Sequence, residues 1–355
     1  MEKSIVPSIA KHPFGDLRWD VLVTGGKMPV QITIIGLGQV GSSIGLALAG
    51  QPNIRRVGHD KNYEIGRLAQ KNGAIDEFKI NLPASVSEAN VVILSLPLSE
   101  IRDTLGYIAQ DLQEGTVLLD TAPAKTTVAT WFNEMIPEGR YYVGLAPAMG
   151  ASYLHGTDLG VASARADLFA KGLFVVNAPH RTPGEAVKLA TDLVSLLGAY
   201  SMISDSMEAD GLLASTHILP QLASAALLDA TVDQPGWAEA RKVAARPYAT
   251  ATAAVAYHDE AKSLSEAAVV NRENTVRVLD AYMASLQKLR DQIQQGDGKS
   301  VAEFLEDAMK AHHRWLDERT KAEWQRAESP EIQSFGDKLS HMFLGNAMER
   351  MKKRK

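Results

Sequence analysis

The sequence of 355 residues predicts an α/β fold, a doubly wound parallel sheet, followed by an all-helical domain. Between Val30 and about Ile203 short apolar runs alternate with amphipathic stretches, whereas no strand-like run returns after Asp205. Continuous apolar strands separated by helices are typical of parallel sheets covered on both faces. We therefore predict a sheet domain over residues 28–204 and a helical domain over 205–355. Residues 1–27 are predicted to be an extension, for which a disordered segment and an early start codon both stay open.

The predicted strands are short apolar runs, and the predicted helices between them are amphipathic stretches. The strands are Val30–Ile35, Arg55–Gly58, Val91–Leu96, Thr116–Asp120, Tyr141–Leu145 and Leu173–Val176. The first helix follows a glycine-rich segment and runs through Leu48, and others cover Tyr63–Asn72 and Ser99–Ala109. This alternation predicts strand–helix–strand units.

The second half is rich in the strong helix formers Ala, Leu, Glu, Lys and Gln. Helices are predicted within Met207–Ala230, Ala238–Tyr257, Leu264–Gln295 and Val301–Glu323. Residues 238–256 are rich in alanine, whose small side chain lets helices approach closely. Two interpretations stay open for this stretch: a seam between two subunits, or a helix buried within one subunit.

Composition excludes several classes of function. The chain has no cysteine, which excludes disulfides, thiolate metal sites and thiol nucleophiles. A net charge of −5 gives no overall basic field for nucleic acid. No signal-peptide pattern and no uninterrupted membrane-length apolar stretch is apparent, so we expect a cytoplasmic protein without a membrane partner. No zinc-binding, hydrolase-elbow or P-loop motif occurs, and no metal is predicted.

The sharpest motif is G-x-G-x-x-G at Gly36, Leu37, Gly38, Gln39, Val40 and Gly41. A predicted strand precedes it and a predicted helix follows it, which is the context of a Rossmann dinucleotide site. The first glycine permits a tight turn, the second lets the backbone approach a diphosphate, and the third lets helix and strand pack closely. The free N–H groups and the positive dipole end of the helix then face the phosphates.

Asp60 follows the next predicted strand, 19 residues after Gly41. A carboxylate there can accept the ribose hydroxyls of the adenosine and repels a 2′-phosphate, so NAD is predicted over NADP. The nearby cations Arg56, His59 and Lys61 leave NADP open. Ligands bind at the carboxyl ends of parallel strands, so we expect four residues at such ends to line the nicotinamide side of the cleft. They are Ser95, Leu96, Pro97 and Thr121.

An ordered series of segments resembles the prephenate and arogenate dehydrogenase family over roughly Val30 to Leu289. The segments are I-I-G-L-G-Q-V-G-S-S at 34–43, G-A-I-D at 73–76, L-S-L-P at 94–97, D-T-A-P-A-K at 120–125, G-L-A-P-A-M-G at 144–150, A-D-L-F at 166–169, T-P at 182–183, L-G-A at 197–199, A-S-T-H-I-L-P-Q at 214–221, and Asn271. The order of the series is far more specific than any single motif.

The resemblance implies an N-terminal Rossmann domain and a helical domain that dimerises. It also implies oxidative decarboxylation of prephenate or arogenate on the route to tyrosine. A base takes the proton of the ring hydroxyl, a hydride passes to the nicotinamide, and loss of CO₂ makes the ring aromatic.

The sequence departs from the family pattern at the residues that carry this chemistry. The serine of a motif resembling D-x-x-S-x-K is Pro123 here, and the catalytic histidine of H-P-x-x-G is Ala146. Alanine has no proton acceptor and cannot be a general base. The second histidine of S-H-L-P-H falls on Gln221, and the carboxylate-binding arginine falls near Val255.

Four residues are the candidates for the substrate side. His217 and Lys125 are predicted as catalytic residues, and Gln221 and Arg246 as substrate-binding residues, with Arg241 as an alternative to Arg246. For His217 a structural role stays open, as does a solvent-exposed lysine for Lys125 and simple packing for Gln221. His155 and His180 are expected to be surface residues, although either could be recruited as a base.

The leading prediction is an NAD(P)-dependent oxidoreductase of the prephenate or arogenate dehydrogenase type, acting on a small carboxylate and forming a homodimer through its C-terminal helices. Two alternatives stay open: a related dehydrogenase with a different substrate, and a dinucleotide-binding protein without catalysis.

Overall fold

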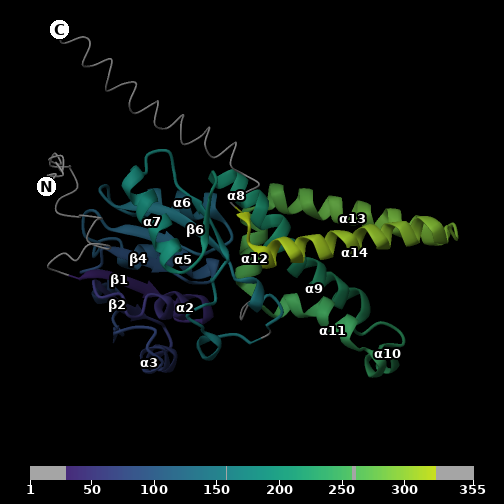
Figure 1. Ribbon diagram of the computed structural model, residues 1–355, viewed down its shortest axis with the longest axis horizontal. Helices are drawn as coiled ribbons and strands as arrows, with labels where there is room; N and C mark the ends of the chain where they lie inside the picture. The colour runs from purple at the N-terminus through teal and green to yellow at the C-terminus, as the bar shows by residue number, and fades with distance from the viewer. Residues whose placement is uncertain (1–28, 157, 258–260, 325–355) are drawn as a thin grey trace, which may run out of the picture. The chain divides into compact units, whose positions relative to one another are not determined.

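The computed structural model describes residues 29–156, 158–257 and 261–324. The predicted extension over residues 1–27 lies outside this range. An eight-stranded sheet has the order β3-β2-β1-β4-β5-β6-β7-β8. Its strands are β1 Val30–Ile35, β2 Ile54–His59, β3 Glu77–Phe78, β4 Val91–Leu94, β5 Val117–Asp120, β6 Tyr141–Ala148, β7 Leu173–Asn177 and β8 Tyr200–Ile203. Its strands β1, β2, β4 and β6 are labelled in Figure 1. The six predicted strands are confirmed, and β3 and β8 are additions to them.

The sheet is parallel except where β6 meets β7, which corrects the prediction of an all-parallel sheet. Residues 141–144 of β6 pair in parallel with β5, and residues 144–148 pair in antiparallel register with β7. The second half of β6 therefore extends past the end of β5. Position 146 lies on this extension, beyond the carboxyl ends of the parallel strands.

Helices cover both faces of the sheet, as a doubly wound fold requires. They are α2 Gln39–Ala47, α3 Tyr63–Lys71, α4 Leu82–Val86, α5 Leu98–Ile108, α6 Lys125–Met135 and α7 Gly184–Leu196. One apolar cluster joins the strands to Ile44 of α2, Ala69 of α3 and Leu189 of α7. A second cluster joins the opposite face to α5 and α6, through residues such as Leu105 and Phe132.

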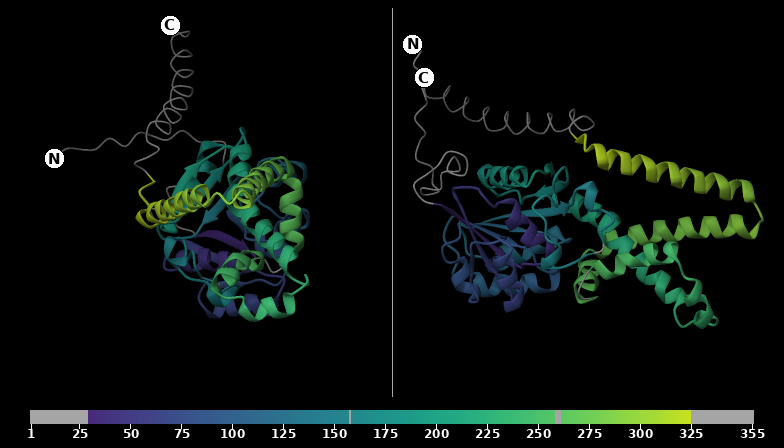
Figure 2. Two further views of the ribbon diagram at one scale, coloured as in Figure 1. Left: turned by 90° about the vertical axis from the view of Figure 1, so that its right-hand side faces the viewer. Right: turned by 60° about the horizontal axis from the view of Figure 1, so that its bottom comes forward.

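After β8 the chain is helical, as predicted (Figure 2). The elements are α8 Ser206–Leu213, the π-helical turn η3 Ala214–Ile218, α9 Leu219–Thr231, α10 Trp237–Val243, α11 Arg246–Thr252, the 3-10 turn η4 Ala253–Tyr257, α12 Ala261–Val270, α13 Arg272–Gln294 and α14 Gly298–Lys321. The last strand, β8, ends at Ile203, just before the predicted boundary at residue 204, which stays a prediction. Residues up to Phe304 nevertheless form one compact unit, and a second begins at Leu305.

Two helices of the sheet domain receive capping hydrogen bonds from the helical region. The carboxylate of Asp210 on α8 accepts the backbone N–H of Lys125 at 2.6 Å and of Thr126 at 3.1 Å, at the start of α6. The hydroxyl of Ser263 on α12 accepts the N–H of Leu98 at 3.0 Å, at the start of α5. Asn271 donates to the carbonyl of Asp210 at 2.8 Å and holds it in place. These contacts fix the helical region over the carboxyl edge of the sheet.

The alanine-rich helices lie at the surface of the described chain. Neither α10 nor α11 has a buried residue. This excludes the interpretation of residues 238–256 as a helix buried within one subunit, for the part that the structure describes. The run Ser206–Thr231 has the length and composition of a membrane-spanning helix, whereas no such stretch was expected from the sequence. Core helices of soluble proteins share these properties, and Ile218 within the run is fully buried in the second cluster.

Candidate active site

The glycine motif forms a tight turn between β1 and α2. Gly36 has φ +89°, and a Cβ there would lie 2.2 Å from the carbonyl oxygen of Ser95. A Cβ at Gly41 would lie 2.0 Å from the carbonyl oxygen of Gly36, so both positions require glycine. A Cβ at Gly38 would meet nothing within 4 Å. Since no side chain caps α2 at Gly38, the first N–H groups of the helix face open space suited to a phosphate.

Asp60 lies beside this turn, directly after β2. Its carboxylate accepts the N–H of Leu37 at 2.8 Å and the N–H of Asn62 at 2.8 Å. The carboxylate is therefore held against the glycine turn from the neighbouring strand. A carboxylate has about four acceptor positions, so it can still accept a sugar hydroxyl.

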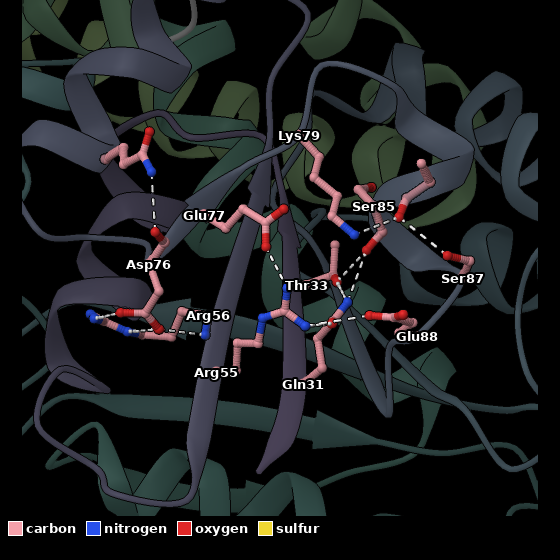
Figure 3. Close-up of polar contacts among 12 residues, drawn as sticks. Gln31, Thr33, Arg55, Arg56, Asp76, Glu77, Lys79, Ser85, Ser87 and Glu88 are labelled. Carbon is pink, nitrogen blue, oxygen red and sulfur yellow. Dashed lines mark hydrogen bonds and ion pairs between the residues drawn. The ribbon is translucent and has the colours of Figure 1, made fainter. Parts of the chain in front are cut away.

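The three basic side chains near Asp60 each have a hydrogen-bond or ion-pair partner. Arg56 pairs with Asp76 and donates to the carbonyls of Gly45 and Gly73, as Figure 3 shows for the ion pair. The ring of His59 is 2.9 Å from the carbonyl oxygen of Lys79, and Lys61 pairs with Glu100. None of these contacts directs a cation toward Asp60.

The four residues predicted to line the nicotinamide side lie together at the ends of β4 and β5. Ser95 N–H donates to the carbonyl of Ile35 at 2.8 Å, and Thr121 N–H donates to the carbonyl of Leu94 at 3.0 Å. Ser95, Leu96, Pro97 and Thr121 are each partly exposed. The carboxyl edge thus presents accessible side chains next to the glycine turn.

Lys125 is fully buried in a polar cluster with Asp120 and Tyr142. Its ammonium donates to the side chain of Asp120 at 2.9 Å, to the carbonyl of Asp120 at 3.1 Å and to the carbonyl of Leu145 at 2.9 Å. An ammonium has three protons, so none remains for a substrate carboxylate. This geometry favours a structural role for Lys125 over the predicted catalytic one, and the alternative of a solvent-exposed lysine is wrong because the side chain is fully buried.

Burial sets the electrostatics of this cluster. It lowers the pKa of Lys125, against the attraction of Asp120, and it raises the pKa of Tyr142 well above its ordinary value. The Tyr142 hydroxyl donates to the second oxygen of Asp120 at 2.6 Å. Tyr142 therefore stays neutral at physiological pH, and the cluster is closed on itself.

Ala146, at the position of the family's base, is buried in a small apolar cluster with Val175 of β7 and Ala209 of α8. Pro123, at the position of the family's serine, lies just before α6. Of the two exposed histidines His155 and His180, neither lies at these positions, in keeping with the expected surface role. The described residues around Ala146 in this cluster therefore carry no proton acceptor.

The segment A-S-T-H-I-L-P-Q forms the π-helical turn η3 and the start of α9. His217 is exposed, whereas Gln221 is only 3% exposed. The two residues are joined by a hydrogen bond from the Gln221 amide nitrogen to the carbonyl of His217 at 2.7 Å. The π turn was not among the predicted elements. Its signal was present, since S-T-H-I-L-P-Q has one residue more between histidine and proline than S-H-L-P-H.

The substitutes for the missing arginine lie on the exposed helices. Arg246 is the exposed first residue of α11, and Arg241 is exposed on α10 and donates to the carbonyl of Ala238. Val255 offers no charge, and its N–H donates to the buried hydroxyl of Ser224 on α9 at 3.3 Å. The structure thus brings the cofactor-side candidates together but does not bring Arg246 to them.

Similar sequences belong to one group of enzymes. The model of the prephenate dehydrogenase nucleotide-binding domain matches residues 45–203. A prephenate dehydrogenase of Lactococcus lactis subsp. cremoris is 27% identical over 290 residues, which cover 79% of this chain and 76% of that protein. A cyclohexadienyl dehydrogenase of Zymomonas mobilis is 24% identical over 283 residues, which cover 79% of this chain and 94% of that protein.

Solved structures share the fold. A prephenate dehydrogenase from Aquifex aeolicus, in complex with hydroxyphenyl propionate and NAD⁺, has a TM-score of 0.70 at 20% identity, covering 80% of this chain and 98% of its own. An arogenate dehydrogenase from Synechocystis has a TM-score of 0.63 at 19% identity, covering 81% and 100%. Residues 45–203 match the nucleotide-binding domain of prephenate dehydrogenases, and the relatives over most of the chain carry related names, in agreement with the resemblance seen in the motifs. The chain is thus similar to prephenate dehydrogenases, with alanine at position 146.

Proposed function

We propose that the protein is an NAD-dependent dehydrogenase of the prephenate or arogenate type. The observation that carries the proposal is the glycine turn with its uncapped helix end and Asp60 held beside it. The relatives named prephenate and cyclohexadienyl dehydrogenase support the reaction class. They favour this function over a dehydrogenase of unrelated substrate and over a binding protein without catalysis.

The residues of the turn fit a nicotinamide dinucleotide. The N–H groups at the start of α2 would bind the diphosphate over Gly38, and the Asp60 carboxylate would accept the ribose hydroxyls. Arg56 pairs with Asp76, and Lys61 pairs with Glu100, so these contacts of the two cations do not offset the repulsion that we expect between Asp60 and a 2′-phosphate. NAD⁺ when bound accepts a hydride from the substrate. Ser95, Leu96, Pro97 and Thr121 would then line its reactive end.

On the substrate side, His217 stays a proposed acid–base residue, and Gln221 and Arg246 stay proposed substrate ligands. Ala146 supplies no base, and such assistance contributes roughly a hundred- to ten-thousand-fold in rate. We therefore expect turnover to be slow relative to a family member with histidine at this position. The substrate would be a small carboxylate.

We also propose a cytoplasmic homodimer that forms through the helical region. Four exposed apolar residues on α13 repeat with heptad spacing, namely Val276, Met283, Leu286 and Ile293. Such a stripe is typical of a helix that packs against another helix. The molar mass of the protein, measured by light scattering as it elutes from a size-exclusion column, tests this proposal. The double variant Met283→Glu with Leu286→Glu should be a monomer where the wild-type protein is a dimer. A monomeric wild-type protein would refute it.

The decisive experiment mixes the purified protein with NAD⁺ or NADP⁺ and with prephenate or arogenate, and follows the absorbance of the reduced cofactor. We expect turnover with NAD⁺. Calorimetric binding of NAD⁺ without turnover of either substrate would instead favour the binding protein without catalysis. Absence of cofactor binding would refute both.

A further inference from the structure

Two helices of the sheet domain begin without a cap from their own residues. They are α5 and α6, and each follows a strand whose end belongs to the proposed nicotinamide side: β4 leads through Pro97 into α5, and β5 leads through Thr121 into α6. The N-cap positions of the two helices are Pro97 and Ala124, and neither makes a side-chain capping bond to the described residues. Proline and alanine have no side-chain acceptor, so the first N–H groups of both helices need an acceptor from another element.

Both acceptors come from the helical region. The Ser263 hydroxyl on α12 accepts the N–H of Leu98, which lies 165 residues earlier in the chain, at 3.0 Å. The Asp210 carboxylate on α8 accepts the first N–H groups of α6 in the same way. Two other helices of the sheet domain, α3 and α4, are capped by their own Asn62 and Asn81. The two helices that continue from the proposed nicotinamide side are thus capped by residues that are distant in sequence.

The hydrogen bond between Ser263 and Leu98 is shielded from water. Ser263 is 3% exposed and Leu98 is 1% exposed. Leu98 and Ala267 of α12 are members of the second apolar cluster, and Leu96 and Leu264 pack against it. A buried N–H that loses its acceptor cannot bond to water unless the packing around it opens. Loss of the Ser263 hydroxyl should therefore loosen the first turn of α5.

This hydrogen bond holds one end of the short segment 96–97, which would lie against the nicotinamide ring. Before the segment, Ser95 N–H donates to the carbonyl of Ile35 on the neighbouring strand β1 at 2.8 Å. After the segment, Leu98 N–H donates to Ser263. The segment thus runs from an anchor in the sheet to an anchor in the helical region.

We propose that Ser263 is a positioning residue for the nicotinamide ring: through Leu98, its hydroxyl holds the end of β4 in place from the region that carries the proposed substrate ligands. This inference rests on the proposed function. The diphosphate and the adenosine would be bound elsewhere, at the turn over Gly38 and by Asp60. The cap should therefore affect binding of the nicotinamide end of the dinucleotide and leave binding of the ADP-ribose part unchanged.

The test compares the calorimetric dissociation constants of NAD⁺ and of ADP-ribose, which lacks the nicotinamide ring. In Ser263→Ala the ratio of the NAD⁺ constant to the ADP-ribose constant should rise about three- to ten-fold, the range of one neutral hydrogen bond. An unchanged ratio in the folded variant would overturn the proposal and leave the cofactor site intact. If the wild-type protein does not bind ADP-ribose, the proposed cofactor site is itself refuted, and this proposal with it.

A matched control removes a cap at another place in the sheet domain. Asn81→Ala removes the acceptor of the Ala84 N–H, 2.8 Å away, at the start of α4. This helix lies against the amino end of β1, where the Gln31 amide donates to the carbonyl of Ser85 at 3.2 Å. Both variants should melt at a lower temperature, but the ratio should change in Ser263→Ala and not in the control. An equal change in both would indicate a general loosening and overturn the proposal.

Two further variants separate the hydroxyl from the packing of the side chain. Ser263→Thr keeps the hydroxyl and should keep the wild-type ratio; the ratio of Ser263→Ala in folded Ser263→Thr would overturn the proposal. Where Ser263→Ala does not fold, Ser263→Cys takes its place, because sulfur is a weaker acceptor than oxygen. Its ratio should rise by a smaller factor, and a ratio equal to that of the wild-type protein would overturn the proposal.

Discussion

The polar groups at the two ends of β1 and β2 differ in whether they have hydrogen-bond partners within the protein. At the amino end, Gln31 donates to Thr33 and to the carbonyl of Ser85, and Arg55 pairs with Glu77 and Glu88 (Figure 3). At the carboxyl end, the first N–H groups of α2 have no side-chain cap and Gly38 faces open space. We infer that polar groups which stabilise the fold bond to one another, whereas polar groups which bind a ligand have no partner within the protein.

The buried cluster of Lys125 provides the strictest test of this comparison. It lies at the carboxyl end of the sheet, and yet its polar groups bond to one another. Lys125→Met leaves the charge of Asp120 buried without its partner, and should lower the free energy of unfolding by about 3–5 kcal/mol. Urea denaturation measures this loss. The double variant with Asp120→Asn should recover part of it. A loss below about 1 kcal/mol in the single variant would show that the cluster is not closed.

Gly38→Ala, at the start of α2, should weaken the binding of NAD⁺ without lowering the stability of the protein. The added methyl group meets no protein atom within 4 Å, so the melting temperature should change little. It occupies the space proposed for the diphosphate, and loss of one or two charge-assisted hydrogen bonds should weaken NAD⁺ binding on the order of a hundred-fold. Gly36→Ala is the matched contrast, since its Cβ would clash with Ser95 and destabilise the protein itself. Unchanged NAD⁺ affinity in Gly38→Ala would contradict the proposed site.

Asp60→Ser should change the choice between cofactors. Loss of the carboxylate should weaken NAD⁺ binding by roughly ten-fold and remove the repulsion of a 2′-phosphate. The measurement is the ratio of the NAD⁺ and NADP⁺ dissociation constants, which a general loosening of the turn would leave unchanged. The wild-type ratio should favour NAD⁺, and the variant ratio should move toward one. An unaltered ratio would remove Asp60 from the site.

Asp76→Asn should affect stability alone, by the smallest amount. Burial raises the pKa of Asp76, but hydrogen bonds from Arg56 outweigh it and hold the pKa below its ordinary value of 3.8. The stabilisation is therefore present above pH 3.8 and is lost as the pH falls through the lowered pKa. Since the carboxylate is 43% exposed, we expect a loss of about 1 kcal/mol at neutral pH. Denaturation at several pH values checks this, and NAD⁺ affinity should not change.

The sequence predicted the parts of the site whose chemistry depends on residue identity at a fixed spacing. The glycines at 36, 38 and 41 and the carboxylate at 60 lie where the pattern placed them. The strand β8 was missed because its residues are half-buried or exposed and form no continuous apolar run. The antiparallel pairing of β7 with β6 was missed because an apolar run marks a strand but does not encode the direction in which it pairs.

The roles of Lys125 and Gln221 depended on partners that spacing does not show. Lys125 carries the same charge whether it faces solvent, a substrate or Asp120, and only the fold decides which. The π turn depends on hydrogen-bond register, which an apolar pattern does not encode, although the additional residue before Pro220 marks it.

The packing around position 146 makes the loss of the family's histidine hard to reverse. Ala146 is buried in one apolar cluster with Val175 and Ala209, and we expect an imidazole at this position to overpack that cluster. Making room means moving α8, and α8 also carries the Asp210 carboxylate that caps α6. A base at position 146 therefore cannot be added without also disturbing the cap of α6.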